Sequence, residues 1–239
     1  MPRFFGGRID GDTAYIEGDD ARHLSRSLHA KPGQQLTLSD GNGTDYNCKI
    51  REVGQVVALD ILSHCPCLSE PRAKIRLYQA LPKGDKLEFI IQKAVELGVS
   101  EVIPVLTSRC ISRPSHKAMD KKLTRLQRIA YEAAKQSGRG VVPKISGLVE
   151  FDQAIIRMSE CELPILFYED SPRPIRDVLK PDPGSISIMV GSEGGFSGSE
   201  AEFAAKRGIH LAELGRRILR CETAPVAALS VILYHTGEL

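Results

Sequence analysis

The chain has 239 residues, of which 42% are hydrophobic and 26% are charged. These proportions are ordinary for a soluble globular protein, and no run approaches the roughly 20 apolar residues that a membrane span needs. The first residues lack the apolar core of a secretory signal, so we expect a cytoplasmic protein with no membrane partner.

The basic residues are concentrated in the middle of the chain. The net charge is only +2, but residues 75–145 carry 14 Lys or Arg against 6 Asp or Glu. Such a region favours a polyanionic ligand, nucleic acid above all, with a solvated helix face as the alternative. Six cysteines and six histidines show no disulfide framework and no metal-ligand spacing, so we expect reduced thiols and no bound metal.

The first 70 residues are predicted to form a small β-barrel-like module. Alternating patterns predict strands at 13–17, 35–38, 46–51 and 56–62, and the turn sequence at 40–43 predicts a hairpin. A single helix is expected over 19–29, where Ala21, Leu24 and Leu28 recur at helical spacing. The two-proline segment 63–71 is predicted to be a linker.

From residue 74 the pattern alternates between strands and helices. Strands are predicted at 75–81, 101–106, 163–168, 185–190 and 209–214, and helices at 87–98, 117–136 and 222–235. This alternation predicts a mostly parallel sheet that helices cover on both faces. Ligands of such sheets bind at the carboxyl ends of the strands.

Two glycine-bearing segments, 191–200 and 214–224, follow the last two predicted strands. Glycines at 191, 194 and 195 permit positive φ and leave room for a ligand, although a tight turn explains the first segment equally well. Ser197 and Glu200 have the spacing of a capping box at a helix start. In the second segment the apolar residues Ile218 and Leu219 stand among charged residues. We therefore expect the two segments to form two walls of one small-molecule pocket. The spacing fits neither a dinucleotide fingerprint nor a P-loop, and no serine nucleophile elbow is present.

These two segments carry a resemblance to a known family. Gly191-Ser-Glu-Gly-Gly-Phe-Ser and Leu214-Gly-Arg-Arg-Ile-Leu-Arg-Cys-Glu-Thr-Ala resemble the paired signature of the ribosomal RNA small subunit methyltransferase E family, among the trefoil-knotted SPOUT methyltransferases. Further matches are Arg3-Phe4-Phe5, His23-Leu24, Gln79-Ala-Leu-Pro-Lys-Gly84, Lys93-Ala-Val-Glu-Leu-Gly-Val99, Ser108-Arg109, Glu132-Ala-Ala-Lys-Gln-Ser-Gly-Arg139 and Pro143. The resemblance covers nearly the whole chain. Ser192 and Arg216 stand where the family usually has proline, and His29 where it often has arginine.

The resemblance implies an α/β protein of two domains. A PUA-like β-barrel that binds RNA would span 1–70, and a SPOUT α/β trefoil-knot domain would span 74–239. The stretch after Leu214 would be threaded through a loop, with Ile218 and Leu219 buried under another segment. Family members are homodimers paired through their knotted C-terminal helices. Here the last helix would pair partly through its apolar face, with core packing as the alternative: Val226, Leu229, Ile232 and Leu233.

The activity that the resemblance implies is S-adenosylmethionine-dependent methylation of N3 of a uridine in 16S ribosomal RNA of the 30S subunit. The adenine would lie near Leu214, Ile218 and Leu219, and the methionine end near 191–195. The full set of expected cofactor-binding residues is Leu166, Gly191, Glu193, Gly194, Gly195, Leu214, Gly215, Ile218, Leu219 and Thr223.

Arginines and carboxylates are the expected catalytic groups, because loss of the N3 proton leaves an anion that a guanidinium can stabilise. The candidates are Arg109 and Arg139 for the base or its phosphate, Arg220 for the knot or the substrate edge, and Glu193 or Glu222 for the proton or the cofactor amine. A structural ion pair is an equal alternative for Arg220 and Glu222. The residues expected to contact RNA are Arg3, Arg8, His23, Lys83, Lys117, Lys121, Arg125 and Arg128.

Two other functions stay open. A related SPOUT enzyme would methylate a ribose 2′-hydroxyl or a transfer RNA base, which analysis of the modified nucleosides distinguishes. A non-catalytic RNA-binding assembly factor would not bind S-adenosylmethionine.

Overall fold

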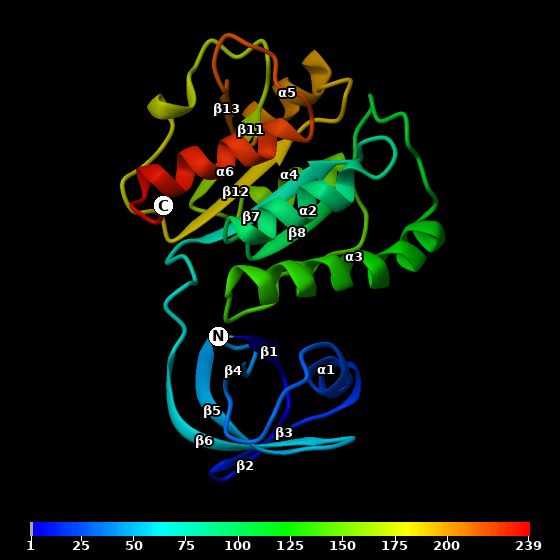
Figure 1. Ribbon diagram of the computed structural model, residues 1–239. Coiled ribbons are helices and arrows are strands. Elements are labelled where there is room, and N and C mark those ends of the chain that lie inside the picture. Colours follow the sequence, from blue (N-terminus) through cyan, green and yellow to red (C-terminus); the bar gives the residue numbers. More distant parts are fainter. Residues whose placement is uncertain (1) are drawn as a thin grey trace. The chain divides into compact units, whose positions relative to one another are not determined.

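The computed structural model describes residues 2–239, apart from the side chain of His116. The chain forms two compact units (Figure 1). The first comprises the residues up to Glu70 together with Ala134–Val142, and the second comprises Pro71–Ala133 and Pro143–Leu239. The sequence-based boundaries of 1–70 and 74–239 did not assign 134–142 to the first unit.

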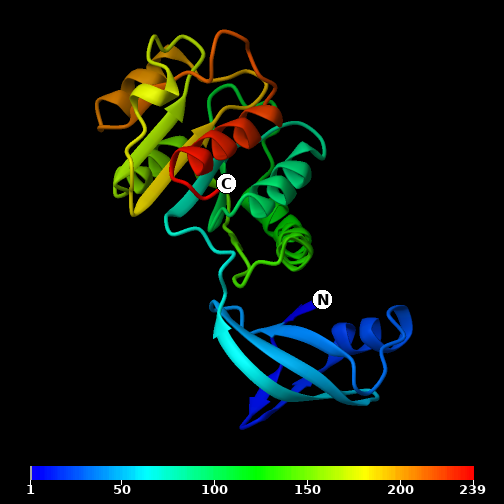
Figure 2. The same cartoon turned by 60° about the vertical axis from the view of Figure 1, so that its left-hand side comes forward.

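The first unit is a curled six-stranded sheet, seen most clearly in Figure 2. Its order is β1-β4-β5-β6-β3-β2, and every pair is antiparallel except β1 with β4. The strands are β1 Arg3–Phe5, β2 Arg8–Asp10, β3 Thr13–Ile16, β4 Gln35–Ser39, β5 Thr44–Val53 and β6 Val57–Pro66. Alternate residues enclose an apolar core that includes Phe4, Leu36 and Leu59. The prediction of a linker from residue 63 was wrong at its start, because β6 stays paired with β5 as far as Pro66.

The helix predicted over 19–29 is shorter and less regular. An α-helix, α1 (Gly18–Arg22), continues into a π-helical turn, η1 (His23–Ser27). Ala21 and Leu24 are buried as predicted, whereas Leu28 is 45% exposed. His29 adopts φ +47°, a left-handed conformation that ends the helical run. The wider π turn shifts the helical period, which removes Leu28 from the buried face.

The second unit contains a parallel seven-stranded sheet of order β10-β8-β7-β12-β11-β13, in which β9 also pairs with β8. The strands are β7 Lys74–Ala80, β8 Glu101–Leu106, β9 Lys144–Ile145, β10 Val149–Glu150, β11 Leu163–Phe167, β12 Ser185–Val190 and β13 His210–Ala212. All five strands predicted here are confirmed. Every residue of β11 is buried, as expected of a strand covered on both faces.

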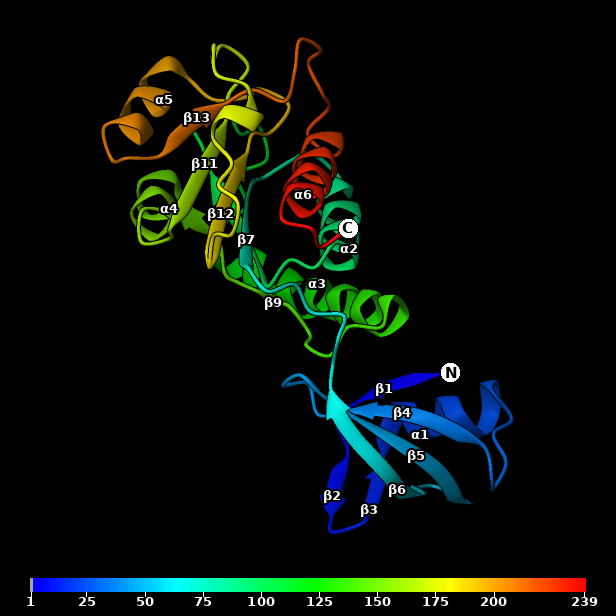
Figure 3. The same ribbon diagram turned by 90° about the vertical axis from the view of Figure 1, so that its left-hand side faces the viewer.

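Helices lie on both faces of this sheet, which Figure 3 views nearly edge-on. α2 (Lys86–Glu96) and α6 (Thr223–His235) lie side by side on one face, and α4 (Phe151–Met158) and α5 (Gly198–Ala205) lie on the other. α3 (His116–Ser137) is the longest helix, and a short 3-10 turn, η2, covers Ile175–Asp177. The predicted capping box opens α5, because the Ser197 hydroxyl accepts the N–H of Glu200 and the Glu200 carboxylate accepts that of Ser197. No helix within residues 2–239 has both the length and the apolar character that crossing a bilayer requires.

Candidate cofactor-binding site

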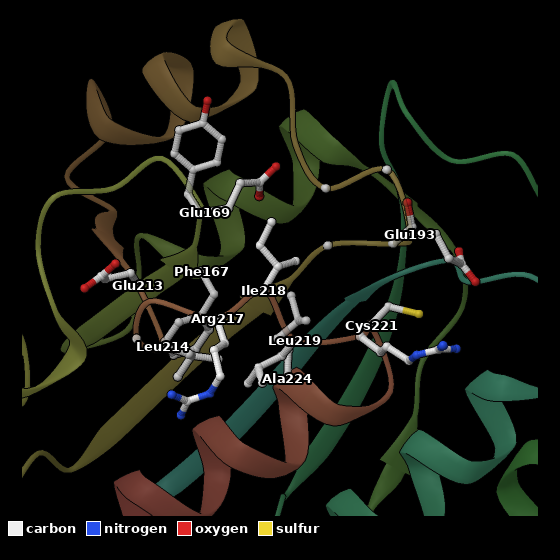
Figure 4. Close-up of a pocket in the computed structure, with 18 of the residues that line it drawn as sticks. Phe167, Glu169, Glu193, Glu213, Leu214, Arg217, Ile218, Leu219, Cys221 and Ala224 are labelled. Atoms are coloured by element: carbon white, nitrogen blue, oxygen red, sulfur yellow. The ribbon is translucent and has the colours of Figure 1, made fainter.

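Three loops meet at the carboxyl edge of the parallel sheet and enclose a cavity of about 490 Å³ (Figure 4). They follow β11, β12 and β13, which are neighbours in the sheet, so their carboxyl ends point to the same edge. The residues that line the cavity are 167–169, 190–195, 212–221, Lys86 and Ala224. Its volume lies within the range of small-molecule sites.

The glycine loop 191–195 forms the first wall. Gly195 has φ +62°, and its N–H donates to the carbonyl of Ser192 at 3.0 Å, which closes a tight turn. A Cβ at Gly191 would lie 3.0 Å from the Cα of Gly195, and one at Gly194 would lie 3.0 Å from the Cβ of Arg109. These glycines are therefore required by close packing of the protein on itself, in addition to any ligand.

Neighbouring elements hold this loop in place. The amide of Gln79, at the end of β7, is fully buried and donates from Nε2 to the carbonyl of Gly191 at 3.2 Å. Arg109 donates from Nη1 to the carbonyl of Gly194 at 3.1 Å. Glu200, besides capping α5, accepts the N–H of Ser108 at 2.7 Å. The loop after β8 and the start of α5 thus fix the glycine loop from two sides.

Residues 213–221 form the second wall. Gly215 has φ +102°, which explains the glycine at this turn. Leu219 is half-buried, but Ile218 is 87% exposed, and Figure 4 shows its side chain reaching across the cavity. The prediction that both residues are buried under another segment was wrong for Ile218. No part of residues 2–239 covers it, so its apolar surface remains open to the cavity.

A lysine that the sequence analysis missed joins the two walls. Lys86, the first residue of α2, donates from Nζ to Glu193 at 2.9 Å and pairs with Glu222 at 3.2 Å. Glu193 lies in the glycine loop, and Glu222 precedes α6. No periodicity or motif distinguishes Lys86 from neighbouring lysines, because its partners lie more than 100 residues away.

This cluster changes the acidity of its members. The hydrogen bond to Glu193, followed by that to Glu222, raises the pKa of Lys86. Burial acts to raise the pKa of Glu193, but Lys86 and the N–H of Lys83 outweigh it, and the net pKa is lowered. The hydrogen bond from the Cys221 thiol, assisted by Lys86, lowers the pKa of Glu222, while burial raises the pKa of Cys221 to about 12. A carboxylate with a lowered pKa is a weaker base, which does not favour either glutamate as a proton acceptor.

Most of the expected cofactor residues line the cavity. Leu166 and Thr223 do not: Leu166 is fully buried within β11, and Thr223 begins α6. Among the expected catalytic residues, Glu193 and Arg220 line the cavity, and Arg220 is exposed with no side-chain hydrogen bond or ion pair to any described residue. Arg109 supports the glycine loop, and Glu222 lies outside the lining but contacts two lining residues, Lys86 and Cys221.

Two of the expected functional arginines form structural pairs in the first unit. Arg139 is 3% exposed, and its guanidinium binds the carboxylate of Glu70, with Nη2 at 2.6 Å. The same carboxylate accepts the N–H of Gly140 at 2.9 Å, which explains why 134–142 packs with the first unit. Arg3 binds Asp45 through both terminal nitrogens, at 2.6 and 2.7 Å.

The remaining residues expected to contact RNA are exposed. Arg8, His23 and Lys83 lie on the surface, and the guanidinium of Arg8 packs 4.5 Å from the ring centre of Tyr15. Four more basic residues recur at helical spacing along one face of α3: Lys117, Lys121, Arg125 and Arg128. Arg125 pairs with Glu88 of α2 at 2.8 Å.

The parallel α/β unit with its glycine-walled pocket and the curled β unit each match a known domain, and together these domains define an RNA methyltransferase with a PUA domain. The chain matches the model of the RNA methyltransferase domain over residues 69–233 and that of the RNA methyltransferase PUA domain over residues 16–56. It is 33% identical to the ribosomal RNA small subunit methyltransferase E of Bacillus subtilis over 96% of this chain and 93% of the relative. The chain therefore belongs to the ribosomal RNA small subunit methyltransferase E family.

Solved structures agree with this assignment. The ribosomal RNA small subunit methyltransferase E of Neisseria gonorrhoeae, bound to S-adenosylmethionine, is 32% identical, with a TM-score of 0.88 over 98% of this chain and 97% of that chain. A putative methyltransferase of Legionella pneumophila, in complex with the same cofactor, is 30% identical, with a TM-score of 0.87 over 98% of this chain and 97% of that chain.

Proposed function

We propose that this chain transfers a methyl group from S-adenosylmethionine to N3 of a uridine in 16S ribosomal RNA of the small subunit. The observation that carries the proposal is the cavity between the loops after β11, β12 and β13. It occurs in a family whose member from Neisseria gonorrhoeae binds this cofactor. A cytoplasmic location follows from such a substrate.

The residues of the cavity fit the chemistry of the cofactor. Leu214, Ile218 and Leu219 offer an apolar surface and backbone polar groups to the adenine, and the glycine loop offers backbone groups and no Cβ to the methionine end. When bound, S-adenosylmethionine supplies a methyl group on a positively charged sulfur, which needs little covalent assistance. The protein then contributes mainly orientation and electrostatic stabilisation.

Arg220 is the residue best placed to act on the uracil. It is exposed beside the cavity, and its guanidinium has no partner among the described residues. A planar cation near O2 or O4 stabilises the anion that loss of the N3 proton produces. Arg109 supports the glycine loop. Glu193 and Glu222 hold the pocket together through Lys86 rather than accept the proton.

Two surfaces complete the proposal. The basic face of α3 would follow the RNA phosphates.

The homodimer would use the outward face of α6, where Val231 and Tyr234 are 40% and 77% exposed and no charged residue occurs between Thr223 and Tyr234. Leu229, Ile232 and Leu233 cannot form this contact, because they are buried in the core of their own subunit. In this proposal the segment after Leu214 is threaded through a loop, so that the chain is knotted.

The test is to incubate unmodified 30S particles, and separately free 16S ribosomal RNA, with labelled S-adenosylmethionine. Digestion and mass spectrometry of the nucleosides should identify 3-methyluridine at one position. A labelled 2′-O-methyl nucleoside, or label in transfer RNA alone, would indicate a related methyltransferase instead. If calorimetry detected no binding of the cofactor at millimolar concentration, the protein would be an assembly factor.

A further inference from the structure

We propose that Lys86 is a positioning residue that fixes the separation between the two walls of the cofactor pocket. This inference rests on the proposed function, because it assigns a role toward the same cofactor. It concerns a residue at the start of α2, outside both glycine-bearing loops. Three features distinguish Lys86: the contacts of its ammonium group, the charges that it separates and its place in the helix.

The ammonium of Lys86 contacts residues of both walls of the pocket and the residue before α6. Nζ donates hydrogen bonds to Glu193 at 2.9 Å and to the Sγ of Cys221 at 3.7 Å, and it forms an ion pair with Glu222 at 3.2 Å. One partner comes from the glycine loop, one is the last residue of the second wall, and one is the residue before α6. The ammonium of Lys86 is therefore directed to the loops that it joins, and it acts on the cofactor through them.

The charges around Lys86 explain why the loops need it. Glu193 and Glu222 come from separate loops, yet both carboxylates bind one nitrogen. Without the cation, two negative charges would face each other in a partly buried site, where their repulsion is weakly screened. The side chains of the three residues are only 23–32% exposed. Neutralising Lys86 should therefore drive the walls apart or protonate one glutamate.

The position of Lys86 is unfavourable for the helix itself. It is the first residue of α2, where the helix dipole favours anions over cations. Lys93 of the same helix, by contrast, pairs locally with Glu96 at 2.9 Å and is similarly exposed at 34%. A residue that opposes local preference and satisfies distant partners is typical of a functional constraint. With Lys86 in place the pocket is ordered before the cofactor arrives, which improves affinity.

The test compares Lys86→Met, which keeps the aliphatic stem, with Lys86→Arg, which keeps the charge. Lys93→Met is the matched control. The dissociation constant for S-adenosylmethionine, measured by calorimetry, should rise about tenfold or more in Lys86→Met. It should rise less in Lys86→Arg and change by less than about twofold in Lys93→Met. Removing the opposed charges as well, in Lys86→Met/Glu193→Gln/Glu222→Gln, should restore several-fold of the missing affinity, which a simple packing role would not do.

Three outcomes would overturn the inference. The first is unchanged cofactor affinity in Lys86→Met, and the second is no recovery in the triple variant. The third is a decrease in RNA affinity alone, which would mean that Lys86 contacts RNA. If Lys86→Met does not fold, Glu193→Gln in the otherwise unchanged chain tests the same bridge by cofactor affinity. Failure of the unchanged protein to bind S-adenosylmethionine would refute the proposed function instead, so the two failures are distinguishable.

Discussion

Ser192 carries one of the two buried side-chain polar atoms in residues 2–239 that have no hydrogen-bond partner. The residue is 7% exposed and belongs to the glycine loop, at a position where the family usually has proline. A buried hydroxyl without a partner destabilises the folded state by its unrecovered desolvation. Ser192→Ala should therefore raise the free energy of unfolding by about 1 kcal/mol. Urea denaturation measures the change, and a decrease would show that the hydroxyl has a partner in solution.

Gly195 provides a sharper test of the loop. Alanine there would have to adopt φ +62°, and its Cβ would lie 2.7 Å from the carboxylate of Glu169. The left-handed conformation alone costs about 1–2 kcal/mol. We expect Gly195→Ala to lower the free energy of unfolding by about that amount and to weaken cofactor binding in calorimetry. Gly198→Ala is the control, because Gly198 has no positive φ and open space around its Cβ position. Equal effects of the two variants would contradict this account.

Single residues were predictable where their role depends on local conformation. Gly191, Gly194 and Gly195 were singled out from the sequence because a tight turn leaves a local signature. Arg139 was expected at the substrate, but Glu70, 69 positions away, encloses its guanidinium. Ionic partners distant in sequence leave no periodic pattern, and for this reason Lys86 was missed and the structural roles of Arg3 and Arg139 were not predicted.

Among the helices and strands, α3 is the element that we expect to bind RNA. Lys117, Lys121 and Arg128 are exposed on one face, and charged groups that neutralise phosphates make binding depend on salt. Replacing these three residues by alanine should weaken binding to ribosomal RNA fragments. Binding should also become less dependent on salt. The negative slope of the logarithm of the binding constant against the logarithm of the salt concentration should decrease in magnitude by about 1 for each phosphate that a lysine or arginine no longer neutralises. Lys206→Ala is the control, because Lys206 directly follows α5 and pairs with Glu202 at 2.7 Å. An unchanged slope would remove α3 from the RNA surface.

The ion pairs of Lys86 with Glu193 and Glu222 connect α2, the glycine loop and α6, and they predict that the stability of the fold depends on pH. Glu193 and Glu222 both have a pKa below the ordinary value of 4.5. Each contributes stability that is fully present above that value and is lost as the pH falls through the lowered pKa. The difference in free energy of unfolding between the unchanged protein and Glu193→Gln/Glu222→Gln should therefore be constant above about pH 4.5 and shrink below it. A difference that grew on acidification would contradict the lowered values.

Whole elements were predicted best where burial gives them a strong pattern. All the strands predicted for the second unit are present, because buried parallel strands read as continuous apolar runs. Several short elements were not predicted from the sequence: the strands β1, β2, β9 and β10 and the eight-residue helix α4. The π-helical turn at His23–Ser27 also escaped, because it depends on packing against the sheet rather than on local propensity.

For the whole molecule, the outward face of α6 predicts the oligomeric state. Tyr234 is 77% exposed on a helix face without charges, so Tyr234→Glu should convert a dimer to a monomer without disturbing the core. Size-exclusion chromatography with light scattering measures the mass. Ile156→Glu, at a 53% exposed position on α4 across the sheet, should leave the mass unchanged. A monomeric unchanged protein, or a dimeric Tyr234→Glu variant, would exclude this interface.

The sequence by itself determined the alternation of strands and helices, the two glycine-bearing loops and the family to which they point. These features are local, since periodicity and turn chemistry act over a few residues. Only the tertiary structure decided which side chains meet: Lys86 with Glu193 and Glu222, Arg139 with Glu70, and 134–142 with the first unit. It also left Ile218 uncovered beside the cavity. Charge pairs and buried contacts depend on distances in space that sequence separation does not encode.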